Sequence, residues 1–285
     1  MDQKQNNIIK DLSSNIDKLL DDFIKLFPTE VGNLISKKNL SVFKKNYIEK
    51  YKNLCALNTD VPVTSSCLLD RYICSKSNHE KSKQFDFEIK GIVNEVKKAL
   101  ENSRSDSLLH NEIGGIIKNL ILSIDVSPDS TNNDYRNRLN EILVFNLISE
   151  NKNIKGISIE KKIGNGKSCD FECKCVDGSI VLLEVLSINN LDVKKQDNSL
   201  TFSEFIQEKI EKKYKDKTKN LNVIPDIRIF PILEYVEGLE NFDITISLDY
   251  SIKPYTVIKN KVNDFEEICL ETLEDVSEQF RNQMI

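Results

Sequence analysis

The chain has 285 residues, of which 39% are hydrophobic and 30% are charged, and its formal net charge is -5. This length suits one large domain or two ordinary ones. The acidic balance excludes a protein that coats nucleic acid through global positive charge, although a local basic groove is compatible with it. No run approaches the ~20 apolar residues that span a bilayer, and the first residues lack the layout of a signal peptide. We therefore expect a cytoplasmic protein that does not enter membranes.

The first part of the sequence has the pattern of helices. Between Ile8 and Phe27 apolar residues recur at helical spacing, and Pro28 closes this predicted helix. Gly114 and Gly115 fall inside a later helical stretch, where they predict a kink or close helix packing. The later helices are predicted at 39–57, 85–102 and 107–124, with loops around 59–62 and 75–83.

A run of polar residues with one proline interrupts the chain at 127–134. Ser, Asp, Asn and Thr favour turns because their side chains bond nearby backbone groups, and Pro128 disfavours a continuing helix. We place the domain boundary here. A helical domain over 1–132 is expected to recognise substrate, dimerise or regulate, and a second domain follows over 133–285.

Helices and strands are mixed in the predicted second domain. The turns Gly164-Asn165-Gly166 and Asp177-Gly178 are strong hairpin signals, so the strands that they join should be antiparallel. Thr201 and Glu204 have the spacing of a capping box. The order predicts a mixed sheet with helices on its faces, an α/β or α+β fold. Helices are predicted at 134–150, 201–220 and 262–280, and strands at 157–163, 169–176, 179–186, 227–233 and 242–248.

Two carboxylates in these strands are the main functional signal. Glu184 interrupts the apolar run 180–186, which indicates a strand buried on both faces. A buried carboxylate is costly unless something offsets its charge, and without that offset Glu184→Ala should be the more stable protein. The hairpin would bring Asp170 to the same spot. Hard oxygen ligands there would suit Mg²⁺ or Mn²⁺.

The cysteines and histidines give weaker signals. The seven cysteines are scattered, apart from Cys169, Cys173 and Cys175 on one predicted strand face. We interpret these three as small buried hydrophobes in a protein of a reducing compartment. His79 and His110 have no partnering motif and are expected at the surface.

The residues from Ser168 to Glu184 resemble the core of the PD-(D/E)XK nuclease superfamily, which has the restriction-endonuclease-like fold. The resemblance covers residues 134–235. It implies that Asp170 and Glu184 bind the metal and that Glu141, on the preceding helix, joins them. The family's proline before the Asp is replaced here by Cys169, a harmless change.

A second departure affects the chemistry. Where the family has a lysine two residues past the Glu, this chain has Leu186. In some members the basic residue moves onto the next helix, and by that analogy Lys209, or otherwise Lys213, supplies the charge. Lys209 lies on an apolar stripe of the predicted helix, so its aliphatic stem could pack over the core and bring its ammonium group to the buried acid. The other reading, Glu172-Cys173-Lys174, would abandon the buried Glu184.

The predicted helix 201–220 also offers a nucleic-acid contact. Lys209, Lys213 and Lys217 would form a ridge against phosphates beside the site. The alternative left open is that lysines near a helix end only complement its dipole.

These observations predict a nuclease that depends on Mg²⁺ or Mn²⁺ and acts on nucleic acid, with DNA as the expected substrate. A homodimer would suit double-strand cutting. Two alternatives stay open: a catalytically inactive nuclease-fold module that binds nucleic acid or a protein, and a helical adaptor with an unrelated α/β domain.

Overall fold

The computed structural model describes residues 3–56, 67–76, 82–124, 134–188, 202–234 and 258–260. The chain forms two compact units, Met1–Ile142 and Leu143–Ile285. Several predictions fall outside the described residues and stay predictions: the break and domain boundary around 127–133, the loop at 59–62, the capping residue Thr201, the strand at 242–248 and the helix at 262–280.

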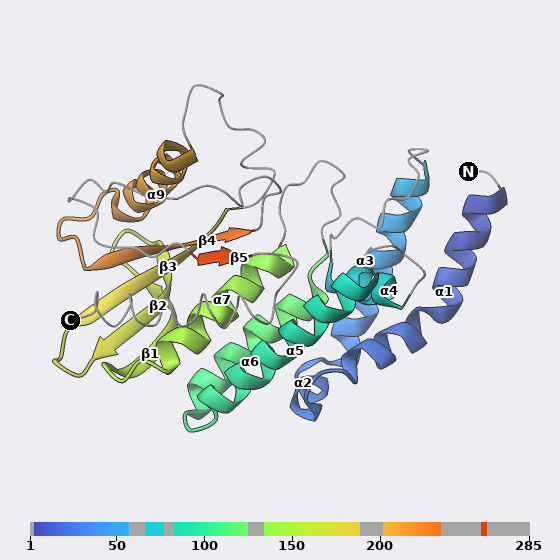
Figure 1. Cartoon of the computed structure of the whole chain (residues 1–285), viewed down its shortest axis with the longest axis horizontal. Helices are drawn as coiled ribbons and strands as arrows, with labels where there is room; N and C mark the ends of the chain where they lie inside the picture. The colour runs from blue at the N-terminus through green and yellow to red at the C-terminus, as the bar shows by residue number, and fades with distance from the viewer. Residues whose placement is uncertain are drawn as a thin grey trace. The chain divides into compact units, whose positions relative to one another are not determined.

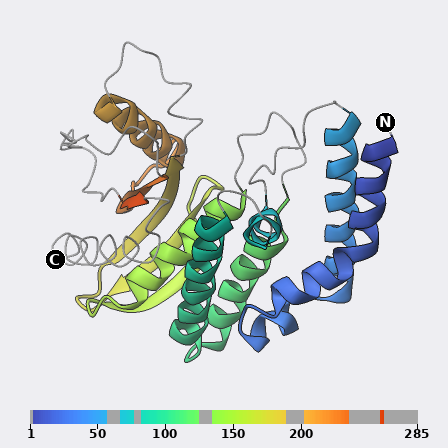
Figure 2. The ribbon, with the colours of Figure 1, turned by 45° about the vertical axis from the view of Figure 1, so that its right-hand side comes forward.

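The first unit is helical, as the sequence predicts. The predicted long helices are all present, with ends that differ by a few residues. Their bounds are α1 Gln3–Ile24, α3 Lys37–Ala56, α5 Ser82–Ser103 and α6 Ser107–Leu122, and α7 Asp134–Ser149 runs from the first unit into the second. Figures 1 and 2 both show α1 and α3 side by side.

Two short helices were missed by the sequence analysis. They are α2 (Thr29–Leu34, 6 residues) and α4 (Leu68–Ser75, 8 residues). Neither is long enough to show a clear apolar period, which is why a pattern search passes over them. The helix α1 ends at Ile24, a few residues before Pro28, and Pro28 is the N-cap residue of α2.

A buried polar network connects α3 to α4. Asp70 is 1% exposed and accepts hydrogen bonds from the hydroxyl groups of Tyr47 at 2.6 Å and Tyr51 at 3.0 Å. Lys50 Nζ lies 2.8 Å from Asp70 Oδ2 and neutralises its charge. Tyr47, Lys50 and Tyr51 share one face of α3, so their bonds to Asp70 help to fix how the two helices pack.

The second unit is built around a mixed sheet in the order β1-β2-β3-β4-β5. The first three strands form antiparallel pairs, as the hairpin turns predict, while β3–β4 and β4–β5 are parallel. The crossover from β3 to β4 contains α9 (Phe202–Thr218), visible above the sheet in Figure 1. The strands are β1 Ile154–Lys162, β2 Ser168–Cys175, β3 Ile180–Ile188, β4 Ile227–Glu234 and β5 Ile258–Asn260. A mixed α/β architecture is therefore confirmed.

Side chains alternate along β2 and divide the two faces of the sheet. Phe171 is fully buried and stacks on Phe145 of α7, with ring centroids 6.5 Å apart. The predicted buried cysteines share this face, and Cys169, Cys173 and Cys175 are indeed buried free thiols. Asp170 belongs to the opposite face, which α9 covers through the contacts described below.

A search for membrane-spanning segments covered only the part of the chain that the structure describes. None of the helices found there combines the length and the apolar character that crossing a bilayer requires.

Candidate functional site

Asp170 and Glu184 stand opposite each other on neighbouring strands. The register of β2 and β3 pairs Phe171 with Leu183 and Glu172 with Leu182. Carried one residue further, the same antiparallel register faces Asp170 with Glu184, so both side chains leave the sheet on one face. Asp170 Oδ2 accepts the backbone N–H of Val185 at 2.7 Å, which ties the carboxylate to the strand that carries Glu184.

Two lysines of α9 neutralise Glu184. The glutamate is 2% exposed. Lys213 Nζ lies 2.7 Å from Glu184 Oε1, and Lys217 Nζ lies 2.8 Å from Oε2. The lysines are four residues apart on a helix and therefore share one face. The offset that a buried carboxylate needs thus comes from two ammonium groups of the protein itself.

The two lysines differ in exposure and in their other contacts. Lys217 is 13% exposed and also donates to the backbone carbonyl of Ser168, so it is fixed from two sides. Lys213 is 33% exposed, which leaves it accessible from solvent. Burial alone would lower the pKa of Lys213. The attraction and hydrogen bond of Glu184, with smaller contributions from Asp170 and Asp216, outweigh burial and raise that pKa, so Lys213 stays charged.

Lys209 and Glu141 have other partners. Lys209 Nζ lies 5.4 Å from the ring centroid of Phe205 on its own helix, a cation–π contact. Glu141 accepts from Arg138 through both carboxylate oxygens, each at 2.8 Å. These contacts describe where the two side chains lie and leave their predicted roles untested.

The Glu172–Lys174 alternative can be placed as well. Glu172 is 5% exposed, and Lys161 of β1 lies 3.0 Å from its carboxylate. Lys174 is exposed to solvent. Glu172 therefore has a counter-ion from β1, while Glu184 has two from α9.

The contact of Lys217 with Glu184 was not foreseen, because Lys217 was predicted only to touch phosphates. Its spacing from Lys213 was a usable signal, since two residues four apart on a helix can reach the same acid. What the spacing could not show is how close the end of α9 lies to β2.

The donor set fits a hard cation in kind. Carboxylate oxygens suit Mg²⁺, which is often bound by one or two carboxylates and otherwise keeps water and phosphate ligands. Within the described ranges, no group of three or more His, Cys, Asp or Glu side chains could hold a metal.

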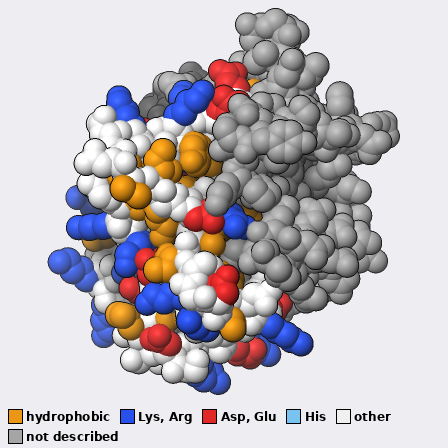
Figure 3. All heavy atoms as spheres, turned by 90° about the vertical axis from the view of Figure 1, so that its left-hand side faces the viewer, with side chains coloured by type: hydrophobic (Ala, Val, Ile, Leu, Met, Phe, Trp, Pro, Cys, Tyr) orange, Lys and Arg blue, Asp and Glu red, His pale blue; other side chains and the backbone are white. Residues whose placement is uncertain are grey.

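On the face drawn in Figure 3, the Lys and Arg side chains of the described residues are interspersed with acidic and apolar ones. Several lysines of α9 have acidic partners: Lys215 pairs with Glu211, and Lys213 and Lys217 with Glu184. The predicted phosphate-binding ridge is therefore partly neutralised by the protein.

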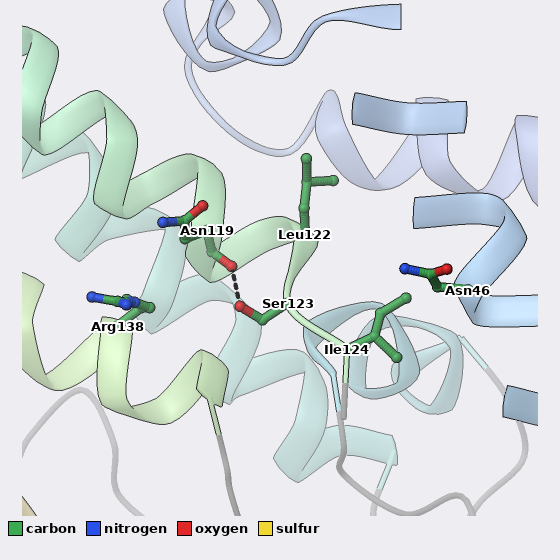
Figure 4. A pocket seen from close by; sticks show the side chains of 6 residues that line it. All are labelled: Asn46, Asn119, Leu122, Ser123, Ile124 and Arg138. Atoms are coloured by element: carbon green, nitrogen blue, oxygen red, sulfur yellow. Dashed lines mark hydrogen bonds between the residues drawn. The ribbon is translucent and has the colours of Figure 1, made fainter. Parts of the chain in front are cut away.

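The helical unit contains a separate polar cleft of about 380 Å³. Figure 4 shows side chains of α3, α6 and α7 around it, and the Ser123 hydroxyl donates to the Asn119 carbonyl. Arg138, which lines the cleft, is also the residue that pairs with Glu141. The lining residues are Asn46, Asn119, Leu122, Ser123, Ile124 and Arg138.

Comparisons with protein-family models, with curated proteins and with solved structures find no match for this chain.

Proposed function

We propose that this protein is a divalent-metal-dependent phosphodiesterase that hydrolyses nucleic acid, with a restriction-endonuclease-like core in the second unit. The observation that carries the proposal is the position of Asp170 and Glu184 on one face of neighbouring strands, with Lys213 2.7 Å from Glu184. This is the acidic pair that the resemblance implies, with the basic residue supplied by the next helix.

The residues would divide the work as follows. Asp170 and Glu184 would hold Mg²⁺ or Mn²⁺, which supplies positive charge that activates water and stabilises charge on phosphorus. Lys213 is partly exposed and charged, so it can contact a phosphate oxygen of the substrate. Lys217 is fixed on Ser168 and Glu184 and keeps the acid oriented.

The second candidate is a nuclease-like module that binds nucleic acid without cutting it. One observation favours it: each oxygen of Glu184 already has an ammonium partner within 2.8 Å. A cation would have to compete with these two charges for the carboxylate. An acid that is neutralised permanently would serve the fold alone, and the partly exposed Lys213 would be the lysine of this pair that can still reach a phosphate.

Cleavage of DNA and RNA with Mg²⁺ or Mn²⁺ tests the proposal. Glu184→Gln and Asp170→Asn should each reduce cleavage by roughly a hundredfold and weaken Mn²⁺ binding measured by calorimetry. The matched control is Glu172→Gln, a buried glutamate of the same sheet whose partner is Lys161. It should leave both readouts near the wild-type level.

The outcomes separate the two candidates. No cleavage and no Mn²⁺ binding, together with DNA binding that weakens as salt rises, would support the inactive module. Equal losses in Glu184→Gln and Glu172→Gln would show that a general disturbance of the sheet is responsible, against an acidic metal site. If the protein neither cleaves nor binds nucleic acid, both candidates are contradicted.

A further inference from the structure

The turn between β1 and β2 contacts the backbone at the end of α9 through the side chain of Asn165. Asn165 Nδ2 donates to the backbone carbonyls of Lys217 at 2.7 Å and Lys219 at 2.9 Å. Asn165 Oδ1 accepts the backbone N–H of Lys167 at 3.1 Å. Because a carbonyl only accepts and an N–H only donates, these three bonds fix which end of the amide faces the helix.

These carbonyls lie where a helix runs out of internal donors. Within the last turn, Lys215 O accepts from Lys219 N at 3.0 Å and Thr218 O accepts from Leu221 N at 3.1 Å. Asn220 has φ 63°, the left-handed conformation that commonly ends a helix. Asn165 supplies donors to two further carbonyls, so the hairpin contributes to the cap of α9.

The same hairpin also contacts side chains of this helical turn. Lys167 pairs with Asp216, and the carbonyl of Ser168 accepts from Lys217 Nζ, which lies 2.8 Å from Glu184. The backbone of Lys217 is thus held by Asn165 while its side chain reaches the acid. Lys213 precedes it by one turn on the same face.

We infer that Asn165 is a positioning residue: its amide holds the end of α9 where Lys213 and Lys217 meet the carboxylate of Glu184. A role of Asn165 in catalysis rests on the proposed function, because Lys213 and Lys217 take part in a reaction only if the site acts on phosphates. The contact itself can be tested without any activity.

The test measures how fast single lysines are acylated, read by mass spectrometry. Asn165→Asp keeps the acceptor for Lys167 N–H but replaces the amide donor with an oxygen that repels the helix carbonyls. Asn165→Ala removes both functions. If Asn165 acts through Nδ2, both variants should label Lys217 roughly tenfold faster, because the end of α9 opens more often. If Asn165 only shapes its turn, Asn165→Asp should label like wild type.

Two controls separate local opening from unfolding. Asp177 accepts from Ser179 N at 2.9 Å and from its hydroxyl at 2.7 Å in the other hairpin. Asp177→Ala therefore disturbs a comparable turn and should leave Lys217 protected. Cys173 is fully buried in the sheet, so alkylation of its thiol reports unfolding of the whole unit.

The expected result is faster labelling of Lys217 in both Asn165 variants, with Cys173 still protected. Wild-type labelling of Lys217 in Asn165→Asp would overturn the inference. Exposure of Cys173 in both variants would overturn it too, because Asn165 would then support the whole fold. If labelling behaves as expected and the wild-type protein cleaves no nucleic acid, the proposed function fails and the positioning contact stands.

Discussion

Lys213 Nζ lies 2.7 Å from Glu184 Oε1, so the charge of a strand glutamate is met from the helix that follows the strand. Leu186 stands on the strand itself, where the resemblance calls for a lysine. With Lys217 on the second oxygen, the acid is neutralised inside the protein. This pairing has direct consequences for stability.

Glu184→Gln should destabilise the protein in the absence of metal. The sequence alone suggested that removing this carboxylate would stabilise the protein, but that expectation assumed an unpaired acid. Because two lysines would lose their partner, we expect a loss of about 2 kcal/mol, less than for a fully buried pair since Lys213 is partly exposed. Urea unfolding without metal measures it, and an unchanged or higher midpoint would contradict the prediction.

Much of the sheet unit could be predicted from local signals. The two hairpin turns and the apolar run around Glu184 were enough to predict three antiparallel strands, and a capping signal indicated the helix at 201–220, which the structure has as α9. These features depend on neighbours in sequence, which is why pattern and turn chemistry locate them.

The partners within the site could not be predicted in the same way. Which lysine reaches Glu184 depends on the rotation of α9 over the sheet, and tertiary packing decides that rotation. The candidates were Lys209, Lys213 and Lys217. Lys209 lies over Phe205, while the lysines one and two turns later reach Glu184. The bond from Asn165 to the end of α9 joins residues 52 positions apart, and no local pattern carries it.

Asp70→Asn should strongly destabilise the helical unit. Asp70 is the anionic partner of Lys50, and both residues are at most 5% exposed. Breaking a buried pair on one side leaves a buried charge, so we expect a loss of about 3 kcal/mol or more. The control is Asp86→Asn, since Asp86 pairs with Lys76 and Lys90 at the surface and should cost under about 1 kcal/mol. Equal midpoints in thermal unfolding would refute the predicted difference.

Cys173 should make the protein less stable at alkaline pH. Burial, with help from Cys175 and Glu172, raises the pKa of the Cys173 thiol well above its usual 9.0. Above pH 9.0 the thiol of the unfolded chain loses its proton, while the buried thiol of the folded chain keeps it. The contribution of Cys173 to the free energy of unfolding is therefore complete below pH 9.0 and falls as the pH rises. The slope from one such group is about 1.4 kcal/mol per pH unit.

Cys173→Ala should therefore flatten the dependence of unfolding free energy on pH between about pH 9 and about pH 10.5. The substitution also leaves a small gap in the sheet, which shifts the whole curve and does not alter its slope. Denaturant unfolding at several pH values measures both effects. Parallel curves for wild type and variant would show that this thiol does not titrate differently in the folded chain.

Gly114 and Gly115 should respond differently to substitution by alanine. Both lie inside α6, where glycine costs about 0.5–1 kcal/mol relative to alanine. A Cβ on Gly114 would lie 2.9 Å from Leu34 Cδ2 of α2, which confirms close packing at this position, while a Cβ on Gly115 meets no atom within 4 Å. Gly115→Ala should therefore gain most of the helix propensity. Gly114→Ala should gain less or lose stability, because the end of Leu34 must move. Thermal unfolding of the two variants compares them directly, and Gly114→Ala being the more stable would mean that α2 does not pack against α6 in solution as it does here.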